Sequence, residues 1–441
     1  MNKEKIFKLI NTPIGKNIFA NVFRVAVVFT NQIFLVPMYL IFWGTELYGD
    51  WIILSALTSF FTMSDLGLNN VTSNRFCIKF AEGDRSECKS LLFNNFVLVV
   101  GIGILATLAI FVVGLFWDYS NLLNLRTIKG IEATWILTIL TIQVFISMSS
   151  SIMDAIYNCN HLAAKATYLN NICRLANALL ILFGVICHLS ILKICIIAIV
   201  PWIALFAYKK YETKKIFKEQ LSFSDWNFKL FKEVVKPSIV YMGFPMGNIV
   251  IFQGFTFLVN AYFGATILVL FNTTRTLVNF VRTVIQIITS GVKPEFSLAY
   301  GRKDVRFMNS VFKKGLMSCF SLAVFISLLL LICGPWIYGV WTHGKMEFSY
   351  TLMVSFFVAM IFNSIWEACG IVLMSTNNHI GMGIVYIFST LLSLIIGYIF
   401  AASLGNLNLV ALSIGISDIL MVSFSYKKAK SIIGKFIKVQ V

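Results

Sequence analysis

The sequence predicts an all-α integral membrane protein with twelve transmembrane helices, arranged as two parallel six-helix lobes around a central cleft. Hydrophobic residues make up 58% of the 441 positions and charged residues only 12%, whereas soluble domains average about 25% charged residues. Apolar runs long enough to cross a bilayer alternate with short basic loops. A pattern of polar residues in the second apolar run returns in the eighth.

The hydrophobic pattern divides the chain into two sets of six spans. A basic segment, 209–236, separates the sixth span from the seventh, and it is predicted to be a cytoplasmic linker. The N-terminal lobe is therefore 1–208, and the C-terminal lobe with its basic cytoplasmic tail is 237–441. The predicted spans are 16–42, 49–74, 90–116, 132–158, 163–187, 190–208, 237–262, 266–292, 311–334, 349–374, 380–403 and 408–426.

The basic residues indicate the topology. Of the 36 lysines and arginines, four lie within spans, and only Arg126, Lys129, Lys193 and Lys345 fall in loops on one side. The rest lie on the side that holds both termini and the linker. The positive-inside rule places that side in the cytoplasm. The net charge of +17 therefore reports membrane topology and does not predict nucleic-acid binding.

The eighth span carries a polar stripe. Its polar residues recur at intervals of three and four, which places them on one face of a helix about 25 Å long. Membrane insertion of an arginine near the centre of a span is unfavourable by about 2.5 to 3.5 kcal/mol, and the span contains two. Insertion of an apolar residue is favourable by only about 0.3 to 0.6 kcal/mol. The stripe must therefore face protein or a water-filled cavity. It consists of Asn272, Arg275, Asn279, Arg282, Gln286 and Thr289.

The stripe has a counterpart in the first half. Subtracting 217 from each stripe position gives a polar residue of the second span: Ser55, Thr58, Thr62, Asp65, Asn69 and Thr72. The similar segments 81–85 (AEGDR) and 299–304 (AYGRKD) follow these two spans. Because six is an even number, both halves start on the same side of the membrane, and the repeat is parallel. Spans 1, 2, 7 and 8 are predicted to line the cleft.

Charged residues inside the membrane are the candidate functional residues. The predicted substrate-binding set is Arg24, Arg174, Arg275, Arg282, Asn272, Asn279 and Gln286; the predicted ion-coupling or gating set is Asp65, Asp154 and Glu367. Asp65 and Arg282 occupy equivalent repeat positions and are expected to pair in one state. Asp418 is interpreted as structural or peripheral. The alternative is that the four intramembrane acids pair with the four arginines only to stabilise the fold.

Metal and cofactor chemistry are not predicted. The nine cysteines form no CxxC pair and are interpreted as small apolar residues, and the four histidines have no metal-ligand spacing. No P-loop is present, so the energy for transport must come from an H⁺ or Na⁺ gradient or from consumption of the cargo. The first apolar run is too long for a signal peptide and is expected to be retained. Pro37 and Pro245 interrupt spans 1 and 7 and are candidate bending points.

Arginine binds phosphate, and Asn, Gln and Thr bind hydroxyl groups, so the stripe suits an anionic headgroup that forms hydrogen bonds. The segments 46–51 (ELYGDW), 55–57 (SAL) and 63–68 (MSDLGL) resemble the opening of Wzx-type polysaccharide flippases of the multidrug/oligosaccharidyl-lipid/polysaccharide (MOP) exporter superfamily. The resemblance implies a MATE/MOP-like fold. It also implies a flippase, not an enzyme, that moves an undecaprenyl-pyrophosphate-linked oligosaccharide such as an O-antigen unit across the bacterial inner membrane. Ion-coupled alternating access is the implied mechanism, with polysaccharide polymerase and chain-length proteins as candidate partners.

Two other functions compete with this interpretation. A MATE-type drug/cation antiporter would share the twelve spans, but a site for cationic drugs should be rich in acids and aromatic residues, and the eighth span carries arginines. An oligosaccharide polymerase or ligase would typically have a large external loop. Here the longest predicted external loop runs only from Trp117 to Ile131.

Overall fold

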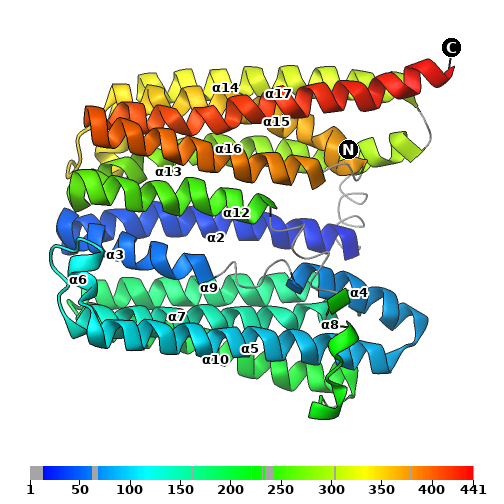
Figure 1. Ribbon diagram of the computed structural model, residues 1–441, viewed down its shortest axis with the longest axis horizontal. Helices are drawn as coiled ribbons and strands as arrows, with labels where there is room; N and C mark the ends of the chain where they lie inside the picture. Colours follow the sequence, from blue (N-terminus) through cyan, green and yellow to red (C-terminus); the bar gives the residue numbers. More distant parts are fainter. Residues whose placement is uncertain are drawn as a thin grey trace, which may run out of the picture. The chain divides into compact units, whose positions relative to one another are not determined.

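The computed structural model describes residues 13–61, 68–160, 162–219, 221–230, 232–233, 243–301, 304–376 and 380–440. Within these residues every regular element is helical, which confirms the predicted all-α class. The chain divides into two compact units, Met1–Ile239 and Val240–Val441. Figure 1 shows the long helices of each unit running side by side.

The first unit is built from nine α-helices and one 3₁₀ turn in its described residues. The helices α2, α9, α10, α7 and α5 pack successively against one another, and α4 packs against α5 and α8. The elements are α2 (Pro13–Phe42), α3 (Gly44–Ser59), α4 (Leu68–Glu82), α5 (Arg85–Phe116), α6 (Tyr119–Leu122), α7 (Ile131–Ile152), α8 (Asp154–Cys159), α9 (Ala163–Ile186), α10 (Ile191–Phe217) and the turn η2 (Phe223–Asp225).

In its described residues the second unit contains five long helices, with two π-helical segments at helix ends. α15 packs against α17, α13 and α14, while α16 packs against α17 and α12. The elements are α12 (Gly243–Ile249), η3 (Val250–Gly254), α13 (Phe255–Gly301), α14 (Val305–Trp341), α15 (Tyr350–Ser375), α16 (Ile380–Ile399), η4 (Phe400–Leu404) and α17 (Leu407–Gln440).

The helices account for the predicted spans. Ten helical stretches in the described residues are long and apolar enough to cross a membrane. One of them, Gly243–Gln286, contains a non-helical residue, Gly264, with a φ of 81°, so it holds the seventh and eighth predicted spans. A positive φ favours glycine because it has no Cβ. The second predicted span is divided between α3 and α4, and residues 62–67 lie outside the described residues.

The two similar segments after spans 2 and 8 provide equivalent helix caps. Asp84 precedes α5 and its carboxylate accepts the backbone N–H of Glu87 at 2.9 Å. Asp304 precedes α14 and accepts the backbone N–H of Phe307 at 3.0 Å. The two caps have nearly the same backbone angles, φ −77° and ψ 82° against φ −79° and ψ 85°. An aspartate at this position satisfies otherwise unpaired N–H groups, which explains why the segment recurs.

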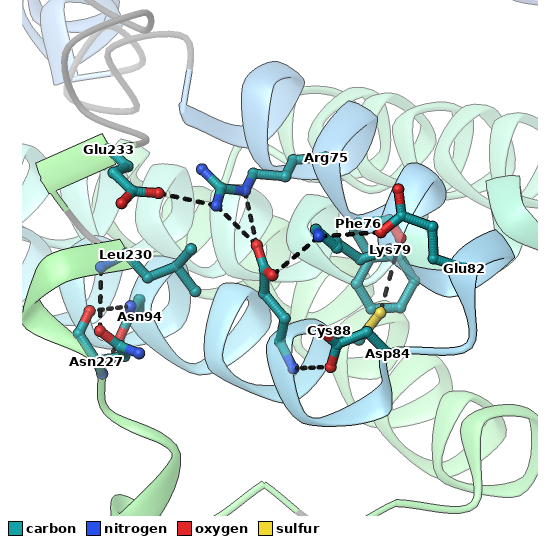
Figure 2. A network of polar contacts seen from close by, with 11 residues as sticks. Arg75, Phe76, Lys79, Glu82, Asp84, Cys88, Asn94, Asn227, Leu230 and Glu233 are labelled. Atoms are coloured by element: carbon teal, nitrogen blue, oxygen red, sulfur yellow. Dashed lines mark hydrogen bonds and ion pairs between the residues drawn. The ribbon is translucent and has the colours of Figure 1, made fainter.

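Charged residues hold one end of the first unit together (Figure 2). Arg75 of α4 contacts Glu87 of α5 at 2.7 Å and Glu233 at 2.9 Å. Lys79 of α4 contacts Glu82 at 2.9 Å and Glu87 at 3.3 Å. The hydrogen bond to Glu82, with that to Glu87, raises the pKa of Lys79 above its ordinary value. These contacts link α4, the first turn of α5 and the segment 232–233.

Asp50, within the ELYGDW segment, binds the loop between the end of α5 and the start of α7. Its carboxylate is buried and accepts the backbone N–H groups of Arg126, Thr127 and Ile128 at 2.7 to 3.2 Å, together with the Thr127 hydroxyl at 2.6 Å. A buried carboxylate is stable only when its acceptor sites are filled. Asp50 therefore holds the loop between the third and fourth spans against α3.

The prediction for the cysteines was wrong at one pair. Cys77 of α4 and Cys159 of α8 form a disulfide, and their Cα atoms lie 5.2 Å apart. The two residues are 82 positions apart in the sequence, so no local spacing pattern could indicate the pairing. The other seven cysteines are free, and five of these are buried, as small apolar residues would be.

Candidate functional site

The stripe of the eighth span borders a cavity inside the second unit. The cavity has a volume of about 50 Å³, enough for a few water molecules and too small for a sugar. Both arginines of the stripe line it, with one acid and two side-chain amides. Its walls are Ile251, Phe252, Arg275, Val278, Asn279, Arg282, Phe356, Ala359, Met360, Asn363, Tyr386, Ile414, Ser417 and Asp418.

Arg275 binds the π-helical segment η3. Its Nη1 donates to the carbonyl of Phe252 at 2.9 Å and to that of Ile251 at 3.5 Å. Its Nη2 donates to Thr256 Oγ1 at 3.0 Å and to the side-chain oxygen of Asn272. A π-helical turn shifts the backbone hydrogen-bond register, so carbonyls beside it can accept other donors. Most of the hydrogen bonds that Arg275 donates therefore go to η3 and to Thr256 just after it. These bonds stabilise η3.

Arg282 keeps unused capacity for hydrogen bonds. Its Nη2 donates to Asn248 Oδ1 at 3.2 Å, and the same oxygen accepts the Tyr386 hydroxyl at 3.0 Å. Its buried Nε has no partner. The guanidinium also lies 5.9 Å from the ring centre of Phe252, within cation–π range. Among the described residues Arg282 forms no ion pair within 4 Å, so it is the better placed of the two arginines to bind an added anion.

Asp418, which was interpreted from the sequence as structural or peripheral, has the buried hydrogen-bond partners of a structural residue. It is buried on α17 and lines the same cavity as Arg282. Its Oδ1 accepts Asn363 Nδ2 at 2.9 Å and Trp366 Nε1 at 2.7 Å, both from α15. Helix packing brings these side chains together, and no spacing within α17 could reveal them. The cavity therefore holds a cation and an acid with separate hydrogen-bond partners.

The remaining residues of the stripe lie at different places along α13. Asn279 lines the cavity, and the Asn272 side chain binds Arg275. Gln286 is exposed and donates to Glu367 Oε1 at 3.3 Å. Glu367 of α15 is half-buried. The stripe thus joins the cavity to a more exposed region in which Glu367 is the acid.

Asp154 of the first unit pairs with Lys209, the first residue of the predicted linker. α10 continues past the predicted end of the sixth span, and Lys209 on it is fully buried. Its ammonium donates to Asp154 Oδ1 at 2.5 Å, to Asn170 Oδ1 at 2.9 Å and to the carbonyl of Ser150 at 3.4 Å. Asn170 also donates to Asp154 Oδ2 at 3.0 Å. The ammonium occupies the position that a bound cation would take beside Asp154.

A polar cavity of about 450 Å³ lies next to this pair, between α4, α7, α8 and α9. Such a volume falls within the usual range for ligand pockets, about 300 to 1,000 Å³. Hydroxyl and amide groups dominate its walls. They are Asn69, Ser73, Ser147, Met148, Ser151, Asp154, Asn158, Ala163, Ala166, Thr167 and Asn170.

The other predicted residues are less closely associated with these cavities. Arg24 on α2 and Arg174 on α9 are exposed within the first unit. Asp65 lies outside the described residues, so its predicted pairing with Arg282 stays a prediction. The described residues contain no group of three or more His, Cys, Asp and Glu side chains that could hold a metal ion.

The fold is similar to that of solved membrane transporters. One is a multidrug resistance MATE family transporter of the MOP superfamily in an inward-facing conformation, with a TM-score of 0.77 and 11% identity over 95% of this chain and 99% of that chain. A second is a MOP superfamily transporter from Pyrococcus furiosus, with a TM-score of 0.66 and 13% identity over 99% of each chain. A third is MATE in complex with MaL6, with a TM-score of 0.64 and 14% identity over 99% of this chain and 100% of that chain.

No protein-family model matches the sequence, and no curated protein matches it. The chain is a multi-pass membrane protein with the fold of MOP superfamily transporters. At 11 to 14% identity this similarity shows the fold alone. It does not assign the chain to the Wzx branch that the ELYGDW and MSDLGL segments resemble.

Proposed function

We propose that the protein is a flippase for an undecaprenyl-pyrophosphate-linked oligosaccharide, such as an O-antigen or related surface polysaccharide unit. It moves the headgroup from the cytoplasmic to the periplasmic leaflet of a bacterial inner membrane by ion-coupled alternating access. The observation that carries the proposal is Arg282, a guanidinium inside a membrane-spanning unit, bordering a cavity, with a buried Nε that has no partner.

A pyrophosphate oxygen can accept the hydrogen bond for which Arg282 Nε has no partner. Guanidinium groups bind phosphate oxygens with paired, charge-assisted hydrogen bonds, and Arg stays charged when it is partly desolvated. The cavity holds only a few waters in this conformation, so the cargo must enter a more open state. Alternating access supplies such a state. The polar cavity beside Asp154 provides amides and hydroxyls suited to sugar hydroxyl groups.

A drug/cation antiporter is the second candidate, because similar solved structures include multidrug resistance MATE transporters. Two features of the site argue against it. The second-unit cavity contains two arginines, and Asp154 of the first unit is neutralised by Lys209. For the similar MOP superfamily transporter from Pyrococcus furiosus, reverse polarity of the binding pocket suggests a different function.

The test is deletion in the native host, complemented with wild type, Arg282→Gln or the exposed control Lys313→Gln. Flipping predicts that deletion removes surface polysaccharide and leaves lipid-linked oligosaccharide facing the cytoplasm. Wild type and Lys313→Gln should restore the polysaccharide, whereas Arg282→Gln should not, at equal protein levels. Accumulation of units that already face the periplasm would identify a polymerase or ligase. Unchanged polysaccharide together with increased drug sensitivity would identify an antiporter.

A further inference from the structure

A groove on the first unit is lined by residues that belong neither to the Arg282 cavity nor to the polar cavity beside Asp154. It consists of two adjoining cavities of about 400 and 370 Å³ between α5, α7 and α10, which share Phe96, Ser149 and Phe206. The first is almost entirely apolar. Its walls are Phe96, Val100, Gly103, Ile104, Thr107, Leu108, Ile142, Phe145, Ile146, Ser149 and Phe206.

Even the small residues of this groove present apolar surface. The Thr107 hydroxyl donates to the carbonyl of Gly103 at 2.7 Å, so its polar atom is already bonded within the helix. A Cβ at Gly103 would lie 2.7 Å from the Phe145 ring, and the glycine therefore lets this ring approach α5 closely. The groove is lined by methyl groups and aromatic rings and suits a hydrocarbon chain.

Positively charged side chains lie at one end of the second cavity. It includes Lys210 and Lys214, one turn apart on α10, and both are exposed. Among the described residues neither forms an ion pair. The acid at this end, Glu219, lies 3.7 Å from Lys89. This end is where α5 begins and α10 ends, the side that the basic loops place in the cytoplasm.

The length of the groove indicates how long the bound lipid chain would be. Its wall on α5 extends from Leu92 to Leu108, which is about 24 Å at 1.5 Å per residue. One leaflet of the hydrocarbon core is only about 15 Å thick. A lipid chain that followed the groove from its basic end would therefore extend past the midplane, where the chains of an ordinary phospholipid end.

We infer that this groove binds a single-chain anionic lipid whose tail is longer than one leaflet, a polyprenyl phosphate or diphosphate. Its phosphate lies at Lys210 and Lys214, and its tail follows α5 past Gly103. The inference deepens the proposed function, because such a lipid would carry the oligosaccharide. The groove would hold the carrier at the cytoplasmic face before or during transfer of the headgroup.

The test is equilibrium binding to the full-length protein in detergent, measured by native mass spectrometry without any transport step. The probes are undecaprenyl diphosphate, farnesyl diphosphate and phosphatidylglycerol. The variants are Lys210→Gln/Lys214→Gln, which removes the charge, and Thr107→Phe, which places a larger side chain in the groove. The matched control is Lys313→Gln/Lys314→Gln, two exposed lysines on α14.

We expect undecaprenyl diphosphate to bind more tightly than either other probe. The charge variant should weaken its binding about 10- to 30-fold, since each basic residue near the headgroup contributes about 1 kcal/mol. Thr107→Phe should reduce binding of undecaprenyl diphosphate and leave binding of farnesyl diphosphate unchanged, which a merely misfolded variant would not do. Equal affinity for phosphatidylglycerol, or equal effects of the control variant, would overturn the inference. Binding by a wild-type protein that does not flip lipid would refute the proposed function and leave the groove assignment intact.

Discussion

The pairing of Lys209 with Asp154 allows a quantitative test of the first unit. Lys209→Met keeps the unbranched stem and removes the ammonium, leaving Asp154 with the Asn170 amide. Asp154→Asn leaves the ammonium without a counter-ion. Removing one partner of a buried ion pair costs about 3 to 5 kcal/mol, because the other charge stays buried. The Asp154 side chain is 22% exposed and that of Lys209 is 0% exposed, so we expect about 3 kcal/mol for Lys209→Met and about 5 kcal/mol for Asp154→Asn.

The double variant Lys209→Met/Asp154→Asn should recover much of this loss, because neither charge remains. Its cost should be at least about 2 kcal/mol smaller than the sum of the single variants. The measurement is thermal unfolding of the purified full chain in detergent, with Lys210→Met as the exposed neighbouring control. At about 2 to 4 °C per kcal/mol, Lys209→Met should lower Tm by about 6 to 12 °C. A Tm within about 2 °C of wild type for both single variants would refute the buried pair.

The same double variant tests the ion-coupling role predicted for Asp154. If it retains flipping with an unchanged dependence on the H⁺ or Na⁺ gradient, Asp154 does not bind the coupling ion. Glu367 and Asp65 would then be the remaining acids of the predicted set. A loss of gradient dependence with retained folding would support the original assignment.

Three further predictions concern structure. Asp50→Ala should destabilise the protein by about 3 kcal/mol or more, because three backbone N–H groups lose their acceptor; Tm should fall, and proteolysis should increase in the 125–130 loop. Gly243→Ala should lower Tm as well, since its Cβ would lie 2.7 Å from the backbone of Gly383, whereas Gly339→Ala, where the added Cβ meets nothing within 4 Å, should not. Cys77 and Cys159 should resist alkylation by a maleimide in the unfolded protein until a reductant is added, and labelling without reductant would exclude the disulfide.

The sequence predicted the spans well because hydropathy is a local property. Each helix must be apolar over about 20 residues to cross a bilayer, and this requirement is visible in any window of that length. The recurrent aspartate before α5 and α14 was also visible, because a helix cap depends on a few neighbouring residues. The stripe of the eighth span was found for the same reason, and the structure places both of its arginines at one cavity.

Contacts between distant residues could not be predicted in this way. Lys209 appeared to begin a basic linker because its charge ends the hydrophobic window, yet α10 continues and buries the ammonium against Asp154. Asp418 appeared isolated because its partners Asn363 and Trp366 belong to another helix. In both cases the decisive information is which helix faces reach each other, and one chain without related sequences contains no record of it.

The hydrogen bonds from Arg275 to η3 make the geometry of this helix depend on what else Arg275 binds. A π-helical turn contains one residue more than the ordinary backbone pattern requires, and the guanidinium bonds to two carbonyls at that point. An anion that drew the guanidinium away would free these carbonyls to return to α-helical pairing. One residue corresponds to a rotation of about 100° about the helix axis, so α12, including Asn248, would turn toward a new set of neighbours. Binding of an anion at Arg275 would thereby rotate α12 about its own axis.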